Sequence, residues 1–141
     1  MQGLSGRVIF NESVASGIHR LDIETSLKEY IPGQFVMVTV PGFFLRRPFG
    51  IADISNGVMT LFVKVAGGGT RELVSVYSGR DVRMLGPLGR GFDMSKMPDA
   101  LVAGGYGLVP FYGLCRKLFE SGERAKLFYG AAKSDALFAM E

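Results

Sequence analysis

One change of pattern, close to Ser95, constrains most strongly how this chain of 141 residues can fold. Before it, apolar residues alternate with polar ones in short pieces that are separated by turn residues. After it, an apolar run leads through a glycine-rich loop into a segment whose apolar residues recur every three or four positions. The first pattern is typical of β-strands and the second of a strand followed by a helix. The sequence therefore predicts two differently built parts, residues 1–96 and residues 97–141.

The first part contains about six expected strands, because its short pieces alternate and are rich in β-branched residues. In one of them His19, Leu21 and Ile23 share a face. The Asn56–Gly57 pair, between two apolar runs, is typical of a hairpin turn. Short strands joined by short turns favour a small antiparallel barrel. One expected strand contains Val8 and Phe10. The others cover residues 19–24, 35–40, 49–54, 58–65 and 81–85.

The second part is expected to form a strand, a helix and another strand. Residues 100–103 and 125–129 are short apolar runs, so we expect two buried strands. Between them, residues 108–121 have helical spacing, with Cys115 on the apolar face. Ser134 is a suitable N-cap for a further helix over residues 134–141. Strand–helix–strand is the beginning of a parallel α/β sheet, and two strands leave that sheet incomplete.

Composition and charge exclude several classes of protein. Apolar residues make up 48% of the chain and charged residues 21%, which is typical of a folded domain. A single cysteine excludes a disulfide framework, and also a four-cysteine iron–sulfur cluster held by this chain alone. The net charge of +3 suits one anionic ligand better than a nucleic-acid surface. With no visible signal peptide or membrane-spanning run, we expect a cytoplasmic protein without nucleic-acid or membrane partners.

Residue patterns for hydrolysis or metal binding do not occur in the sequence. His19 is the single histidine, and we expect it to be a surface or hydrogen-bonded core residue. There is no Ser–His–Asp set, no metal-ligand spacing and no pair of carboxylates at a suitable distance along the chain. We therefore name no catalytic residue and no metal ligand.

A glycine-rich loop, residues 104–110 (GGYGLVP), lies between the expected strand and helix. Glycines let a backbone approach a phosphate closely, and a helix start offers unpaired N–H groups. Pro110 fits the first turn of a helix, but it also occupies the third glycine position of the G-x-G-x-x-G fingerprint. The loop is either a cradle for a nucleotide diphosphate or a tight turn without a ligand.

Two other segments have the composition of a phosphate site. Arg46 and Arg47 would face opposite ways on a strand, and one guanidinium suits a phosphate. Phe49 is expected on the face of Arg47, where it could stack on a flat ring; the alternative is an edge-protecting arginine pair and a core phenylalanine. Gly67–Gly69 followed by Thr70 suggest a phosphate-binding concavity, or Thr70 is a plain N-cap.

Five motifs in one order resemble those of the ferredoxin reductase superfamily, and more closely those of the electron-transfer subunits of dihydroorotate dehydrogenase B. They are Pro32–Phe35 (PGQF), Arg46–Ile51 (RRPFGI), Gly69–Thr70 (GT), Gly86–Phe92 (GPLGRGF) and Gly104–Pro110 (GGYGLVP). The resemblance runs from about Arg7 to Glu141. It implies an FAD-binding β-barrel over residues 1–96, followed over residues 97–141 by the incomplete start of an NAD(P)-binding α/β domain in a C-terminally truncated relative.

The resemblance also implies which residues hold the cofactors. Arg47 would pair with the FAD diphosphate, and Gly69 and Thr70 would donate hydrogen bonds to it. The residues implied along the flavin are Pro48, Phe49, Gly50, Phe62, Val63 and Lys64. The residues implied to receive NAD(P)H are Gly104, Gly105, Tyr106, Gly107 and Pro110. Gly50 departs from the family pattern, which has Ser or Thr at this position near the flavin N5, and it leaves a backbone N–H as the available donor there.

The implied function is electron transfer between NAD(P)H and a partner oxidoreductase by way of FAD. The expected partner is a catalytic dihydroorotate dehydrogenase subunit of pyrimidine biosynthesis. A [2Fe-2S] cluster would need a region beyond Glu141, another chain could complete the α/β domain, and we do not expect the truncated chain to be active alone. The alternatives are a free-standing flavin reductase and a non-catalytic interaction module.

Overall fold

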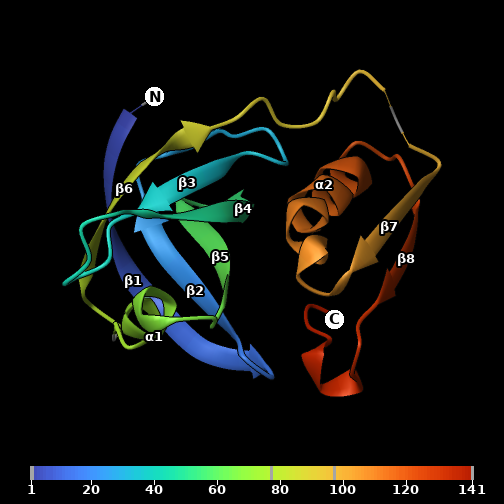
Figure 1. Cartoon of the computed structure of the whole chain (residues 1–141). Helices are drawn as coiled ribbons and strands as arrows, with labels where there is room; N and C mark the ends of the chain where they lie inside the picture. Colours follow the sequence, from blue (N-terminus) through green and yellow to red (C-terminus); the bar gives the residue numbers. More distant parts are fainter. Residues whose placement is uncertain (1, 77, 97, 141) are drawn as a thin grey trace.

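The computed structural model describes residues 2–76, 78–96 and 98–140, and it consists of a β-barrel beside a smaller α/β part (Figure 1). The barrel contains β1 (Gln2–Ala15), β2 (Ile18–Thr25), β3 (Phe35–Val38), β4 (Arg47–Ser55), β5 (Val58–Lys64), α1 (Gly68–Val74) and β6 (Asp81–Leu88). The α/β part contains β7 (Ala100–Gly104), the 3-10 turn η1 (Gly105–Leu108), α2 (Val109–Glu120), β8 (Lys126–Gly130) and the 3-10 turn η2 (Ser134–Ala136). Helix α2 lies between the barrel and the two-stranded sheet.

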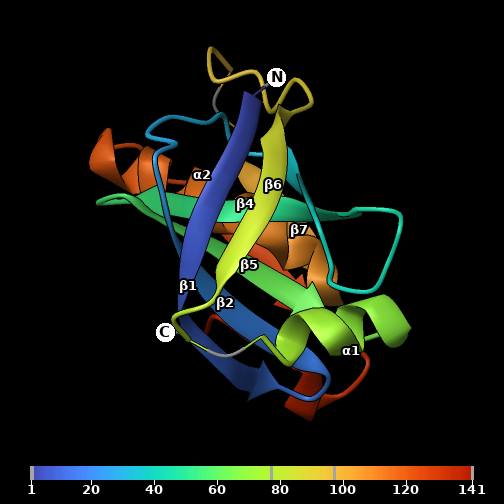
Figure 2. The same cartoon turned by 90° about the vertical axis from the view of Figure 1, so that its left-hand side faces the viewer.

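The six strands close a barrel in the order β1-β2-β5-β4-β3-β6, with every neighbouring pair antiparallel. Figure 2 shows β1 and β6, the first and last strands of the barrel, side by side. The expected small antiparallel barrel is confirmed. Alternating residues fill its interior, and α1 adds Leu73, which is 1% exposed and packs with them. Asn56 and Gly57 both have positive φ, 51° and 76°, as the expected hairpin turn between β4 and β5 requires.

Strand β1 is longer than its alternating piece predicted, because it pairs with both β2 and β6. A bulge between Val8 and Phe10 interrupts the alternation with β2. Val8 consequently lies in the barrel core, whereas the ring of Phe10 lies outside it under the guanidinium of Arg20.

Helix α2 packs against β4 at a point where a side chain would not fit. A Cβ at Gly113 would overlap the hydroxyl of Tyr30 and lie 2.5 Å from the carbonyl oxygen of Ala52. The Tyr30 hydroxyl donates to that same carbonyl at 3.2 Å. A bulge between Ile51 and Asp53 shifts the register of β4 here. Gly113 therefore sets how closely the helix can approach the barrel.

An ion pair fastens the same helix to the same strand. Arg116 Nη1 lies 2.9 Å from Asp53 Oδ2, and Arg116 Nη2 donates to the carbonyl oxygen of Ile54 at 3.1 Å. The next residue of the helix also contacts the barrel, because Lys117 Nζ donates a hydrogen bond to the carbonyl oxygen of Tyr30 at 2.8 Å. Burial raises the pKa of the Asp53 carboxyl, and the Arg116 guanidinium acts against that rise. The burial of Tyr30, with the nearby Asp53 charge, likewise raises the pKa of its hydroxyl.

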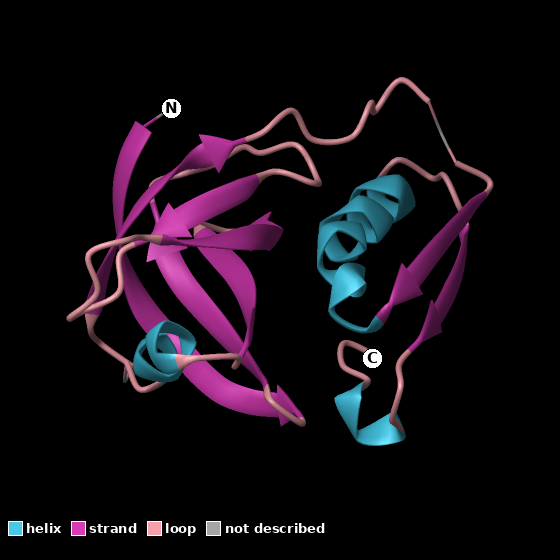
Figure 3. Ribbon diagram, in the orientation of Figure 1, coloured by secondary structure: helices cyan, strands magenta, loops and turns pink. Residues whose placement is uncertain are grey.

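The two-stranded sheet differs in burial from our expectation. Strands β7 and β8 are parallel, as expected, with Val102 opposite Phe128. Leu101 and Ala103 face α2 and are buried, but Val102 is 76% and Phe128 58% exposed. The expectation that both strands are buried was wrong, because among the described residues only one face of the sheet is covered. Figure 3 shows the helix on that one side.

The helix expected from Ser134 was also wrong. Residues 134–136 form a single 3-10 turn, and its N-cap is Lys133 rather than Ser134. Tertiary contacts direct the following residues instead: the Ser16 amide donates to the carbonyl oxygen of Asp135 at 2.8 Å, and Phe138 is buried against Phe62. Burying this phenyl ring outweighs the local preference for a helix. The other helix begins at Val109 rather than at residue 108, which ends η1.

Replacing Gly113 by alanine tests the approach of α2 to the barrel. In an exposed helix this change would stabilise the chain by about 1 kcal/mol. Here the methyl group would overlap the Tyr30 hydroxyl, so we expect a net destabilisation of about 2 kcal/mol or more. Thermal unfolding monitored by circular dichroism measures it. Gly107→Ala is the control, because its Cβ would meet nothing within 4 Å; equal stability of the two variants would contradict the close approach.

The pH dependence of stability tests the Asp53–Arg116 pair. The Asp53 pKa is raised on folding, so its charge costs stability, and this cost develops as the pH rises above its ordinary value of 3.8. Arg116→Met removes the opposing charge and increases the cost to about 2–4 kcal/mol at pH 7, with a smaller loss at pH 4. Urea unfolding at both pH values measures this. In the double variant Asp53→Asn/Arg116→Met, the difference in unfolding free energy between pH 4 and pH 7 that Arg116→Met adds should disappear. If Arg116→Met had the same pH dependence of stability as the wild type, the proposed role of the pair would be contradicted.

Candidate functional site

Arg47 and Gly69, far apart in the sequence, lie in direct contact at the junction of β4 and α1. A Cβ at Gly69 would lie 3.0 Å from Arg47 Nε and 3.3 Å from Nη2, so the absence of a side chain lets the guanidinium lie on the helix backbone. Arg47 Nη1 donates to the carbonyl oxygen of Leu45 at 2.8 Å, and the guanidinium lies 5.5 Å from the centroid of the Phe43 ring. These contacts fix a cation with further donors beside the backbone of α1.

Thr70 organises the glycine segment before this helix. Its Oγ1 accepts hydrogen bonds from the amides of Ala66 and Gly67, at 2.9 and 3.0 Å, and donates to the Gly67 carbonyl oxygen at 3.0 Å. The N-cap of α1 is Gly67, and Thr70 is the third helical residue. The alternative that Thr70 is a plain N-cap was therefore wrong, and its hydroxyl shapes the loop from inside the helix.

Arg46 directly precedes β4 and makes its contact outside this arrangement. Its Nε donates to Thr39 Oγ1 at 3.2 Å, and its side chain is exposed. The two adjacent arginines therefore occupy different surroundings, which makes Arg46 a matched control for Arg47.

The glycine-rich loop after β7 is attached to the barrel through Tyr106. The Tyr106 hydroxyl donates to the carbonyl oxygen of Phe62 in β5. Burial raises the pKa of the Tyr106 hydroxyl to about 12. Gly105 has a φ of 52°, and a Cβ at Gly104 or Gly107 would meet nothing within 4 Å. The loop therefore combines one firm attachment with an open backbone at the start of α2.

Gly50 is the place where the start of α2 meets β4. A Cβ at Gly50 would lie 3.2 Å from Cγ1 of Val109, the first residue of α2. A side chain at this position would therefore press on the helix. This contact gives a physical reason for glycine in a segment whose resemblance predicts serine or threonine.

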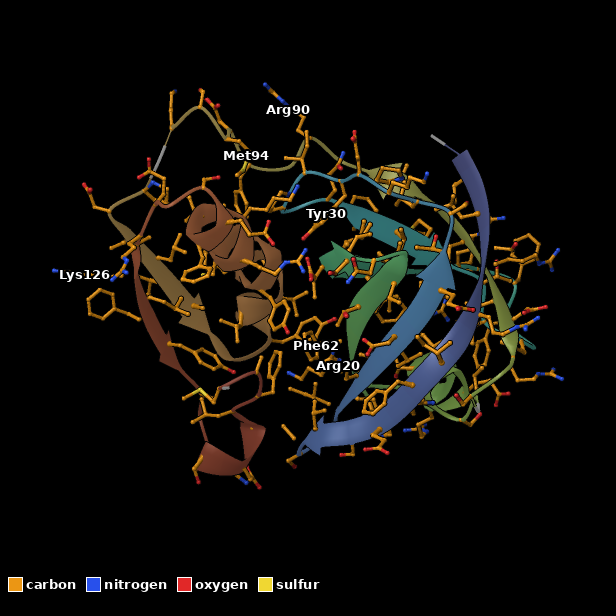
Figure 4. The ribbon with its side chains drawn as sticks, turned by 180° about the vertical axis from the view of Figure 1, so that it is seen from behind. Arg20, Tyr30, Phe62, Arg90, Met94 and Lys126 are labelled. Atoms are coloured by element: carbon orange, nitrogen blue, oxygen red, sulfur yellow. The ribbon has the colours of Figure 1, made fainter. Side chains whose placement is uncertain are left out.

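The two groups of residues lie at the two ends of one continuous strip. The first residues of β4 lead from Arg47 to Gly50, and the neighbouring β5 contains Phe62, whose carbonyl oxygen binds Tyr106. The strip thus connects the cation at α1 with the glycine loop of α2. Figure 4 shows Phe62 and Tyr30 at the junction between the barrel and the helix. An elongated ligand that carries an anionic group fits such a surface, because one end of the surface is basic and the other offers open backbone.

The expected site residues in β4 and β5 differ in the burial of their side chains. Phe49 is 5% exposed and Val63 is fully buried, and both belong to the barrel core. The alternative that Phe49 is a core residue is therefore the one the structure shows. Phe62 is 2% exposed and packs on Tyr112 and Phe138, whereas Pro48 and Lys64 are exposed on the surface. At Phe49, Phe62 and Val63 the side chains are buried, so we expect any contact with a ligand to be made by the backbone.

Sequence patterns did not predict three residues that lie in the site or hold α2 in place: Phe43, Asp53 and Arg116. Phe43 contacts both Arg47 and the helix start, since a Cβ at Gly68 would lie 3.2 Å from its Cζ. The ion pair of Asp53 and Arg116 was also not predicted from the sequence. A signal existed for Asp53, because a carboxylate stands inside an otherwise apolar strand and needs a partner there.

Other classes of site are not seen in the part of the chain that the structure describes. Residues 2–76, 78–96 and 98–140 contain no group of three or more histidine, cysteine, aspartate or glutamate side chains that could hold a metal ion. Within the same residues, every helix is too short or too polar to span a lipid bilayer.

Comparison with known proteins finds sequence relatives of one kind and a shared fold. No protein-family model matches the chain. The dihydroorotate dehydrogenase B (NAD(+)) electron transfer subunit of Clostridium perfringens is 33% identical over 138 residues, which cover 96% of this chain and 56% of that protein. The solved structure of the NADH-dependent reduced ferredoxin-NADP oxidoreductase matches 96% of this chain and 51% of its own, with 26% identity and a TM-score of 0.83. That of phthalate dioxygenase reductase matches 96% of this chain and 46% of its own, with 22% identity and a TM-score of 0.86. The chain spans about half the length of these relatives.

Removing one oxygen atom tests the attachment of the glycine loop. Tyr106→Phe keeps the ring and loses the hydrogen bond to Phe62, so we expect a destabilisation of about 1 kcal/mol and faster hydrogen exchange in residues 104–108. Tyr112→Phe is the control, because the described contact of Tyr112 is made by its ring against Phe62, at 5.6 Å between centroids. Equal exchange rates in the wild-type and Tyr106→Phe loops would contradict the anchoring role.

Proposed function

We propose that this chain binds FAD as part of an electron-transfer protein. Nearly its whole length is homologous to dihydroorotate dehydrogenase B electron-transfer subunits, and the match covers about half the length of each subunit. The observation that carries the proposal is the contact of Arg47 with Gly69, since it places a cation directly against the backbone of α1. A guanidinium and adjacent backbone N–H groups suit the diphosphate of a dinucleotide.

The residues present fit this cofactor at both ends. Arg47 and the backbone of Gly69 and Thr70 would hold the diphosphate, and a Cβ at position 69 would fill that cradle. The backbone of Pro48 and Gly50 would lie along the ring, with Lys64 near the phosphates. When bound, FAD supplies the conversion between hydride transfer and single-electron transfer. The protein's share is to bind the cofactor, orient it along β4 and keep its environment fixed.

The glycine loop is the proposed site for NAD(P)H. Gly104, Gly105 and Gly107 leave the backbone open, and α2 presents its N-terminal end there. Pro110 supplies no N–H but fits the first turn. Tyr106 would act as a positioning residue, because it fixes the loop to β5 through the Phe62 carbonyl.

The exposed face of the β7–β8 sheet supports a proposal about partners. Val102 and Phe128 lie opposite each other on this face and are 76% and 58% exposed. Apolar side chains in this arrangement favour further polypeptide packing on them. We propose that additional polypeptide completes the α/β part, and that the electron partner is a catalytic subunit of the dihydroorotate dehydrogenase type. Co-purification with such a subunit would separate this function from that of a free-standing flavin reductase.

Exchanging single arginines tests FAD binding. Arg47→Ala removes the charge-assisted hydrogen bonds proposed for the diphosphate, so the affinity for FAD should fall by about 10- to 100-fold. Arg46→Ala, the adjacent arginine that faces Thr39, should change it less than about threefold. Titration of the apoprotein with FAD, followed by flavin fluorescence, measures both. Equal affinity in wild type and Arg47→Ala would overturn the site, and a wild-type chain that binds no FAD would favour the non-catalytic interaction module.

A further inference from the structure

The loop between β3 and β4 places a free aromatic ring beside the proposed diphosphate site. Phe43, Phe44 and Leu45 are 37%, 100% and 65% exposed. Single exposed apolar residues are common on proteins. Three in a row, with one phenyl ring wholly in solvent, are not explained by the packing of the barrel. Figures 1 and 2 show this loop projecting from the barrel next to α1.

The two neighbours of Phe44 are held by the site itself. On one side, the Phe43 ring lies under the Arg47 guanidinium and against Gly68, where a Cβ would be 3.2 Å from Cζ. On the other side, the Leu45 carbonyl oxygen accepts a hydrogen bond from Arg47 Nη1 at 2.8 Å. The backbone of Phe44 is thus placed by the same arginine that we assign to the diphosphate, while its ring remains free.

The direction of the strip decides what this ring would meet. A diphosphate held at Arg47 has two substituents, and β4 leads from Arg47 to Gly50 and α2, which is the side proposed for the flavin ring. The other substituent, the adenosine, is left with the loop of residues 41–46. Adenine is flat and stacks on aromatic side chains.

We propose that Phe44 stacks on the adenine ring and gives the chain a preference for FAD over FMN. This inference rests on the proposed function, because it places a part of the same cofactor. FMN carries the same ring and one phosphate but no adenosine. Its binding should therefore be independent of the ring at position 44.

The first test compares two flavins in three proteins. In Phe44→Ala the affinity for FAD should fall by about 5- to 100-fold, with the affinity for FMN unchanged within about twofold. Phe119→Ala is the matched control, because Phe119 is 75% exposed but lies on α2; it should leave both affinities unchanged. Phe44→Ala with wild-type affinity for FAD would overturn the inference and leave the loop as a surface for a protein partner. Failure of the wild-type chain to bind either flavin would instead overturn the proposed function, and this inference with it.

The second test uses the fact that the chain contains no tryptophan. Phe44→Trp introduces one reporter, whose fluorescence should be quenched on addition of ADP, which carries adenine and diphosphate without a flavin. Phe119→Trp is the control and should show no saturable quenching. Quenching of Phe44→Trp by ADP supports adenine stacking even if the variant's FAD affinity is altered. Equal responses of the two tryptophans to ADP would contradict it.

Discussion

The close packing of α2 on β4 is the constraint on which the rest of the structure depends. Gly113 brings the helix against the Ala52 carbonyl and the Tyr30 hydroxyl, and Arg116 then reaches Asp53 at 2.9 Å. A buried ion pair adds little net stability, but it fixes one orientation, because any other would leave Asp53 buried without its partner. The glycine loop leads directly into this helix, so the contact sets where the backbone that we propose for the nucleotide lies relative to the barrel.

The barrel makes its contribution through strand β4, which serves two surfaces at once. Its interior side chains, such as Phe49, fill the core, while its backbone forms the strip from Arg47 to Gly50. Glycines occur at both ends of this strip for one reason, the close approach of another group: the Arg47 guanidinium at Gly69 and the Val109 side chain at Gly50. The proposed cofactor site is therefore mostly backbone and one cation.

Much of this arrangement could be predicted from the sequence where a single element decided the pattern. Alternation predicted the barrel strands, and the change of period after Ser95 predicted β7, α2 and β8. What could not be predicted depended on contacts between elements. Phe49 shares a face with Arg47, but that face leads into the barrel core. Strand β8 is apolar yet exposed, because one side of its sheet has no cover among the described residues. Phe138 packs against Phe62, and residues 134–139 therefore do not continue as a helix.

The central claim is that one flavin dinucleotide lies along β4, with its diphosphate at Arg47 and its ring directed toward the start of α2. An NMR titration of the isotope-labelled chain with FAD tests it most directly, because it reports on each backbone amide at once. The account predicts saturable shifts at Gly50 and at residues 67–70, the two ends of the strip. Shifts confined elsewhere, for example to the cavity of about 580 Å³ between Thr39 and Arg83, or no saturable shifts at all, would contradict it.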